Sequence, residues 1–323
     1  MENNNKLQKN VNLSKYTTYK TGGLARYFVQ IDNVEDLLEC LGSAQKSNIP
    51  VFVLGGGSNI LIHDKGFKGL VLKVLNKKLS VDQLNSDTFE ITVGAGWGLN
   101  NLINQLNEKS ISCLEKLFGI PGTIGGSIRG NAGAGDFEIK DVIEKVYNID
   151  WLKFNNYNFE IKDYSPKECA FGYRDSIFKR KENIIWEAKI IGKLADKDFL
   201  SETKKNILAK RLKSQPYDFP NAGSVFANPK LAEFDLIKIN PEELLIVENK
   251  GEKQVPAGWL IDQCGLKGYS INGAKVSDKH ANFIINFDHA KSEDIFNLIN
   301  FIKEKVFEKF KIILQEEIQL IGF

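Results

Sequence analysis

The sequence has little of what metal sites, disulfide frameworks and membrane spans require. Its four cysteines, Cys40, Cys113, Cys169 and Cys264, lie far apart without a CxxC pair, and its three histidines share no ligand spacing. Neither a metal site nor a disulfide framework is indicated, and the reducing cytoplasm is the expected compartment. No run of about 18 apolar residues is present, and residues 1–12 are polar and unlike a signal or transit peptide. We therefore expect the protein to stay where it is made, away from membranes.

An excess of charge of one sign is also missing. The formal net charge is +2, and lysine and arginine are spread along the chain rather than gathered in blocks. Such a chain has no field that attracts nucleic acid or a membrane surface, so an anionic ligand has to be held by a local site. With 323 residues, 42% hydrophobic and 26% charged, the sequence is typical of a folded protein of two or three domains.

Short β-rich runs alternate with helical patterns near the start of the chain, which is typical of an α/β arrangement. The predicted strands are 25–31, 51–54, 70–74, 89–93 and 183–191, and the predicted helices are 34–47 and 99–107. A polar stretch at 76–88 predicts a boundary near residue 78. A charged helical segment at 197–213, followed by Pro216, predicts a second boundary near residue 206.

The last predicted helix carries an apolar stripe at three-four spacing, made of Ile295, Leu298, Ile299, Ile302, Val306, Phe307 and Phe310. Ser292 is its expected N-cap, with acidic residues in the first turn. We expect three domains, 1–78, 79–205 and 206–310, with a C-terminal strand at about 311–323 that returns to the first.

Three glycine-rich segments stand out, at 55–59, 94–98 and 119–127. Glycines allow positive φ and let backbone N–H groups approach a ligand, which is how loops hold phosphate. A dinucleotide fingerprint is excluded, because Ile60 and Leu99 stand where the third glycine belongs, and no Gly-Lys-Ser/Thr of a P-loop follows. One such loop is equally well explained as a tight turn. Three of them together predict an extended, phosphate-bearing cofactor across two small α/β lobes, without saying which cofactor.

Ordered blocks of sequence carry a resemblance that covers nearly the whole chain. The blocks are 21–23, 54–59, 119–126, 131–134, 171–176, 221–226 with 228–229, 260–263, 265–268, 276–281 and 317–322. They resemble the UDP-N-acetylenolpyruvoylglucosamine reductase family. The resemblance implies a two-lobed FAD-binding domain of the PCMH (vanillyl-alcohol oxidase-like) type, of mixed α+β and α/β character, and a C-terminal α+β substrate-binding domain.

The resemblance also implies a noncovalently bound FAD between the first two expected domains. The family's FAD-contacting residues fall on Thr21, Gly22, Gly55, Gly56, Gly57, Ser58, Asn59, Gly119, Pro121, Gly122, Thr123, Gly125, Gly126, Ser127, Asn131, Ala132 and Gly133.

Three further residues are implied as the reducing centre: Arg174, Ser224 and Glu317. Hydride from flavin N5 would reach the vinyl CH2 carbon of an enolpyruvyl group and leave an enolate. Arg174 is a permanent planar cation suited to that charge, and a protonated Glu317, whose pKa burial would have to raise, could hydrogen-bond it. Ser224 would deliver the proton to the neighbouring carbon. Taken singly, each residue is more often a surface arginine, a turn serine or an exposed carboxylate.

The implied substrate-binding residues are Tyr173, Arg174, Lys213 and Asn228. In the family, a lysine that contacts the substrate phosphate usually stands at the position of Ser214. Lys213 is the candidate to make this contact in its place. Arg174 and Ser224 are only 50 positions apart, which indicates the shorter-loop type of the family. His280 lies in a matching block and is expected to pack or hydrogen-bond locally. The stretch 230–255 is longer than the family's usual link between the serine block and the block at 260–263, and the sequence does not indicate its role.

The implied activity is NADPH-dependent reduction of UDP-N-acetyl-3-O-(1-carboxyvinyl)-glucosamine to UDP-N-acetylmuramate through FAD, in peptidoglycan precursor synthesis and hence in cell shape and division. The expected partners are this UDP-sugar and NADPH, and a monomer is favoured although the sequence does not give the oligomeric state. Two alternatives remain. One is another FAD oxidoreductase of the superfamily acting on an alcohol, lactone or hydroxy acid, and the other is a non-catalytic nucleotide-binding regulator.

Overall fold

A computed structural model describes residues 6–150, 161–180, 183–234 and 241–323 of the chain. The chain divides into two compact units. Unit 1 comprises Met1–Val11, Ala25–Gly56 and Lys68–Lys210, and unit 2 comprises Asn12–Leu24, Gly57–Phe67 and Arg211–Phe323. The division passes through the first glycine-rich segment, between Gly56 and Gly57. The three domains expected from the sequence stay a prediction.

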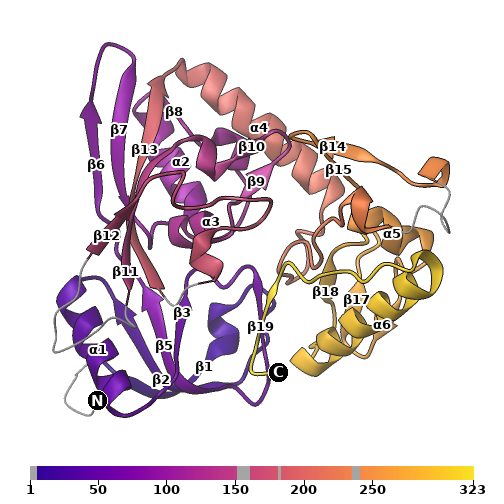
Figure 1. Cartoon of the computed structure of the whole chain (residues 1–323). Helices are drawn as coiled ribbons and strands as arrows, with labels where there is room; N and C mark the ends of the chain where they lie inside the picture. Colours follow the sequence, from indigo (N-terminus) through magenta and orange to yellow (C-terminus); the bar gives the residue numbers. More distant parts are fainter. Residues whose placement is uncertain (1–5, 151–160, 181–182, 235–240) are drawn as a thin grey trace. The chain divides into compact units, whose positions relative to one another are not determined.

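The first sheet of unit 1 has the strand order β1-β2-β5-β3 (Figure 1). Its strands are β1 (Gln8–Asn12), β2 (Leu24–Ile31), β3 (Val51–Leu54) and β5 (Phe67–Val74), and helix α1 (Val34–Lys46) lies between β2 and β3 in the chain. Strands β3 and β5 are parallel, with Leu54 opposite Lys73. The predicted strands and helix of this region are confirmed, because each carries a clear local apolar pattern.

The second sheet of unit 1 is antiparallel and is organised around β13 (Asn183–Leu194), the longest strand. The strand order is β12-β11-β13-β7-β6, and β8 also pairs with β13. The other strands are β6 (Leu79–Gln83), β7 (Thr88–Gly94), β8 (Ile111–Ser112), β11 (Ile143–Asp150) and β12 (Ile161–Tyr164). The reading of 76–88 as a polar boundary missed β6. This edge strand pairs with β7, and its Leu79 and Val81 pack half-buried against the core of unit 1. The alternation contains only these two apolar residues, which is too short a local pattern within a polar stretch.

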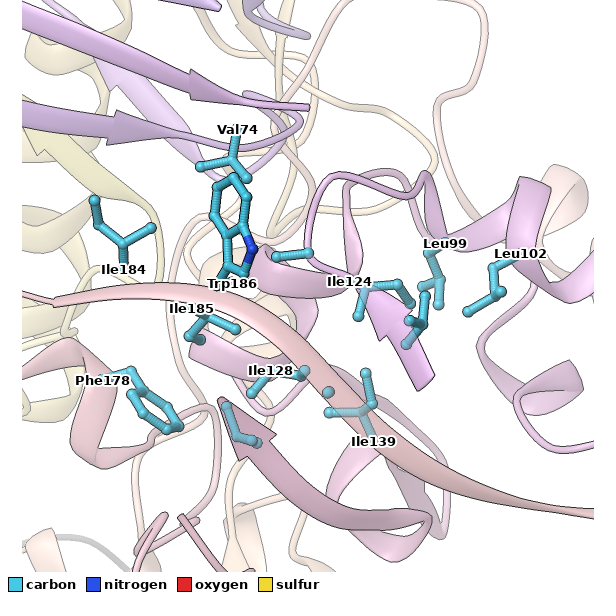
Figure 2. Packing of buried hydrophobic residues seen from close by; sticks show 14 of the residues in the cluster. Val74, Leu99, Leu102, Ile124, Ile128, Ile139, Phe178, Ile184, Ile185 and Trp186 are labelled. Carbon is cyan, nitrogen blue, oxygen red and sulfur yellow. The ribbon is translucent and has the colours of Figure 1, made fainter. Parts of the chain in front are cut away.

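Two short helices complete the core of unit 1. Helices α2 (Leu99–Glu108) and α3 (Ile124–Arg129) bury Leu99, Leu102, Ile124 and Ile128 in the cluster that also holds Trp186 of β13 (Figure 2). Leu200 is the one buried residue of helix α4 (Lys197–Ser214), which agrees with the charged helical segment predicted at 197–213. A short two-stranded sheet, β9 (Gly133–Ala134) with β10 (Phe137–Glu138), follows α3.

Unit 2 contains a small antiparallel sheet and two helices. The sheet joins β16 (Ser270–Ile271), β17 (Ala274–Val276) and β18 (Ile284–Asn286), and the helices are α5 (Ala257–Gln263) and α6 (Ser292–Phe310). The predicted stripe of α6 is buried in the core of unit 2 except at Phe307, which is 46% exposed. Phe307 was wrongly assigned to the buried stripe. Its ring lies instead under the ammonium group of Lys311.

The start of α6 also differs from the prediction. Ser292 is the first helical residue and Lys291 is the N-cap position. The Ser292 hydroxyl accepts a hydrogen bond from Asp64 N, and Ser292 N donates to the Asp64 carboxylate, both at 2.8 Å. The capping role expected of Ser292 is therefore wrong, because a partner far away in the sequence occupies its hydroxyl. Asp294 accepts from Lys291 N in its place.

Unit 2 also contains two strand pairs. The C-terminal strand β19 (Gln319–Ile321) pairs in parallel with β4 (Ile60–Ile62). Strands β14 (Val247–Asn249) and β15 (Glu252–Gln254) form a hairpin within the stretch 230–255, of which 235–240 lie outside the described residues. None of the helices in the described ranges combines the length and apolarity that crossing a membrane needs.

Candidate active site

Two glycine-rich loops of unit 1 approach each other too closely for side chains to fit between them. A Cβ atom on Gly55 would lie 2.8 Å from Thr123 Oγ1, and one on Gly56 would lie 2.6 Å from Gly122 Cα. Glycine therefore lets the loop after β3 lie against the start of α3. Thr123 caps α3, since its hydroxyl accepts from Gly126 N at 3.3 Å. Gly55 and Gly56 are therefore explained by the packing of these two loops against each other.

A lysine that sequence reasoning missed lies at the same loop. Lys73 Nζ donates to the carbonyl oxygen of Gly55 at 2.9 Å, and burial lowers the pKa of its ammonium group. A single lysine inside a predicted strand carries no sequence signal. Only the parallel pairing of β3 with β5 places it beside the glycines.

The glycines of the second segment have a structural use. A Cβ atom on Gly94 would lie 2.4 Å from the carbonyl oxygen of Asn76, and one on Gly96 would lie 2.6 Å from the carbonyl carbon of Leu75. These glycines therefore allow close packing against the chain itself. The same holds for Gly55 and Gly56, and the cofactor contacts expected of the loops at 55–59 and 119–127 stay a prediction.

Arg174 lies in a tight turn of unit 1. Gly172 N donates to Asp175 O at 2.9 Å and Asp175 N donates to Gly172 O at 3.2 Å, and Arg174 itself has φ +51°. The guanidinium group donates to Gly133 O at 2.9 Å, while Asn131 Nδ2 donates to Gly172 O at 2.8 Å. The structure thus brings the predicted catalytic arginine together with two predicted FAD-contacting residues.

Ser224 and Glu317 lie on neighbouring segments of unit 2. Glu317 N donates to the carbonyl oxygen of Val225 at 2.7 Å, and Ala227 N donates to Gln315 O at 3.0 Å. Asn59 joins them, because its Nδ2 donates to Glu317 O at 3.0 Å and its own carbonyl oxygen accepts from Gln319 N. Asn59, Glu317 and Val225, the residue that follows Ser224, therefore belong to one hydrogen-bonded arrangement.

Backbone packing fixes the other predicted residues at the start of unit 2. Gly57 has φ +65°, and a Cβ atom there would lie 1.9 Å from Tyr16 O. Thr21 is buried, and its carbonyl oxygen accepts from Thr17 Oγ1 at 2.8 Å. Only glycine fits at position 57, whatever ligand the loop holds.

The predicted substrate-binding residues are divided between the units. Tyr173 and Arg174 are neighbours in the turn of unit 1, where the guanidinium carbon lies 5.3 Å from the centre of the Tyr173 ring. In unit 2, Asn228 Oδ1 accepts from Ala257 N at 3.0 Å and so supports the start of α5. Lys213 is exposed in the last turn of α4.

The predicted cofactor residues are likewise divided. Unit 1 holds Gly55, Gly56, Gly119, Pro121, Gly122, Thr123, Gly125, Gly126, Ser127, Asn131, Ala132 and Gly133, and unit 2 holds Thr21, Gly22, Gly57, Ser58 and Asn59.

Three of the cysteines are buried, and two of the histidines accept local hydrogen bonds from the backbone. Burial raises the pKa of Cys40 to about 11 and of Cys169 to about 12, so these thiols stay protonated near neutral pH. His280 Nδ1 accepts from Asn282 N at 3.2 Å, which confirms the expected local role, and His63 Nδ1 accepts from Lys65 N at 2.9 Å. Across the described ranges, no group of three or more potential ligands could hold a metal ion.

Two family models match the chain. Residues 215–321 match the UDP-N-acetylenolpyruvoylglucosamine reductase C-terminal domain, and residues 25–151 match an FAD binding domain. The second match covers the loops at 55–56 and 119–126. Both matches confirm the predicted fold class.

Full-length relatives agree with these matches. A UDP-N-acetylenolpyruvoylglucosamine reductase of Carboxydothermus hydrogenoformans is 36% identical over 97% of this chain and 93% of its own length, and one of Prochlorococcus marinus is 35% identical over 99% and 100%. The crystal structure of the enzyme from Thermus caldophilus superposes with a TM-score of 0.73 at 28% identity, covering 98% of this chain and all of its own. The chain therefore belongs to the UDP-N-acetylenolpyruvoylglucosamine reductase family.

Proposed function

We propose that the protein uses NADPH to reduce UDP-N-acetyl-3-O-(1-carboxyvinyl)-glucosamine to UDP-N-acetylmuramate, with FAD as its bound cofactor, in cytoplasmic peptidoglycan precursor synthesis. Family membership supports this reaction. The observation that carries the proposal is the hydrogen bond from Glu317 N to Val225 O, because it joins the segments that hold a proton donor and a carboxyl group.

The family's match to an FAD binding domain supports the loops of unit 1 as the site of the cofactor. Gly55, Gly56, Gly122 and Thr123 would hold its diphosphate through backbone N–H groups, with the Lys73 ammonium group at the Gly55 carbonyl. The chemistry that FAD supplies when bound is the transfer of hydride between NADPH and the enolpyruvyl group. The contacts of Asn131 and Gly133 to the Arg174 turn connect this cofactor region to the proposed chemistry.

We assign each catalytic residue one task. Arg174 binds the carboxylate of the enolpyruvyl group and stabilises the negative charge that develops on it, since a guanidinium group is always charged and forms paired hydrogen bonds. Glu317, when protonated, donates a hydrogen bond to the same charge. Ser224 holds the proton that the neighbouring carbon receives.

The nucleotide end of the substrate requires other groups. We assign Asn228 and Lys213 to the diphosphate and Tyr173 to the sugar side of the substrate. An exposed lysine can bind phosphate as a point charge, which fits the place of Lys213 at the end of α4.

The direct test is the visible spectrum of the purified protein with FAD. NADPH should bleach the flavin absorption anaerobically, and the enolpyruvyl UDP-sugar should restore it. Colour that returns only with oxygen, and not with this substrate, would contradict the proposed reaction.

A further expectation is that FAD is held without a covalent bond. Cys40 and Cys169 are buried thiols, and His63 Nδ1 already accepts a backbone hydrogen bond. Acid precipitation should therefore release all the colour into the supernatant. Flavin that stays with the precipitated chain would argue for a tethered flavin, as in many oxidases of the superfamily.

If NADPH and the sugar nucleotide use the same face of the cofactor, they must bind alternately, and the first product must leave before the second ligand binds. Steady-state rates at varied concentrations of both should give parallel double-reciprocal lines, with inhibition at high concentrations of sugar nucleotide. Intersecting lines would show that both ligands are bound together.

A further inference from the structure

The backbone at Arg174 adopts a conformation that needs support. Its φ of +51° lies in the left-handed region, which is unfavourable for a residue with a Cβ atom. The two hydrogen bonds between Gly172 and Asp175 close the turn around it. The backbone at Arg174 sets the direction of its Cα–Cβ bond, and the hydrogen bond to Gly133 O holds the guanidinium end of the side chain, so a support for the backbone helps to keep this contact in place.

Lys179 supplies such a support. Its Nζ donates to the carbonyl oxygen of Arg174 at 2.6 Å, a charge-assisted hydrogen bond. This carbonyl belongs to the peptide that follows Arg174, and its direction depends on the Arg174 ψ angle. The bond therefore acts on the unfavourable residue itself.

The segment that carries Lys179 is well anchored in unit 1. Lys179 ends a short 3-10 turn, Ile177–Lys179, in which Phe178 is buried. Just before the turn, the hydroxyl of the fully buried Ser176 donates to Arg129 O at 2.7 Å, and Lys179 N donates to Ser176 O. Because the base of the lysine is fixed in this way, its ammonium group restrains the Arg174 carbonyl.

We propose that Lys179 is a positioning residue for the reduction and that it acts through Arg174. It holds the left-handed backbone of Arg174 so that the guanidinium group stays at its contact with Gly133 O. The inference rests on the role of Arg174 in the proposed function. It predicts that loss of Lys179 affects the step in which Arg174 acts and leaves flavin reduction by NADPH unchanged.

The test is a double-mutant cycle with Lys179→Met, Arg174→Met and both together, measured by stopped-flow absorbance in each half-reaction. Lys179→Met should slow reoxidation by the enolpyruvyl UDP-sugar by about 10–100-fold, the scale of a misplaced catalytic group. Bleaching by NADPH and FAD affinity should change by less than about threefold, and Lys179→Arg should recover most of the lost rate. In the Arg174→Met background, the Lys179 change should add less than about threefold, because a residue that acts through Arg174 has nothing left to position.

A matched control is Lys167→Met, an exposed lysine of the same unit, which should behave as the unchanged protein. If Lys179→Met fails to fold, Lys179→Gln replaces it, since glutamine is neutral and shorter. A full effect of Lys179→Met in the Arg174→Met background, or equal slowing of both half-reactions, would overturn the inference. If Arg174→Met slows reoxidation and Lys179→Met does not, the inference alone is wrong. If Arg174→Met leaves reoxidation intact, the proposed role of Arg174 is wrong and the inference falls with it.

Discussion

Replacing Ser224 by alanine is expected to slow reoxidation of the reduced enzyme by the enolpyruvyl UDP-sugar by about 10²–10⁴-fold, the usual scale for a lost positioned acid. Bleaching of the flavin by NADPH should keep nearly its normal rate, because the proton from Ser224 is needed only after hydride has moved. Stopped-flow absorbance of the two half-reactions, each started separately, measures both rates.

The structure indicates that this change removes little besides the hydroxyl. On one side of Ser224, Gly223 has φ +76° and its N–H donates to Asn221 Oδ1. On the other, Val225 N donates to Asn282 O at 2.8 Å and Phe226 N to Asn282 Oδ1 at 2.9 Å. None of these bonds uses the serine side chain, so the backbone should keep its course in the variant.

Two comparisons sharpen the result. Ser270→Ala removes a hydroxyl from an exposed position of the same unit and should leave both half-reactions unchanged. Glu317→Gln keeps a hydrogen-bond donor but not the carboxyl group, and it should slow the same half-reaction as Ser224→Ala. Loss of NADPH bleaching with intact reoxidation, in either site variant, would contradict the assignment of that residue to the enolate.

Replacing Gly56 by alanine is expected to weaken FAD binding by about 10–100-fold, since overpacking typically costs about 1–3 kcal/mol. The added Cβ atom would lie 2.6 Å from the Gly122 Cα atom and 3.1 Å from its carbonyl carbon. Both are backbone atoms, so one of the two loops has to move. Fluorescence titration of the apoprotein with FAD gives the dissociation constant directly.

The matched control is Gly98→Ala. Gly98 has an ordinary φ of −65°, and the nearest atom to an added Cβ lies 3.5 Å away on a flexible asparagine side chain. This variant should bind FAD as the unchanged protein does. Equal affinities of the Gly56→Ala and unchanged proteins would mean that the contact between the loops at 55–56 and 119–126 does not form the cofactor site.

The sequence alone predicted those elements whose signal is local. Helices α1 and α2 and the buried stripe of α6 follow from apolar spacing along a short stretch, and the strands β2, β3 and β7 follow from β-rich runs between turns. The close approach expected of glycines is also local, because the absence of a Cβ atom is a property of the residue itself. The family and the identities of the candidate residues came from ordered blocks that resemble known reductases, not from spacing or composition.

Tertiary contacts decided the rest. Strand β6 forms by pairing with β7 and by packing of its two apolar residues against the core. Ser292 does not cap α6 because Asp64 occupies its hydroxyl, and Lys73 lies at Gly55 only through strand pairing. Asn59 and Glu317 are 258 positions apart, and their hydrogen bond arises from folding alone. The sequence determined which chemical groups are available and which short segments become helices or strands. Which groups meet was decided by the fold, since contacts between distant residues depend on packing that no local pattern contains.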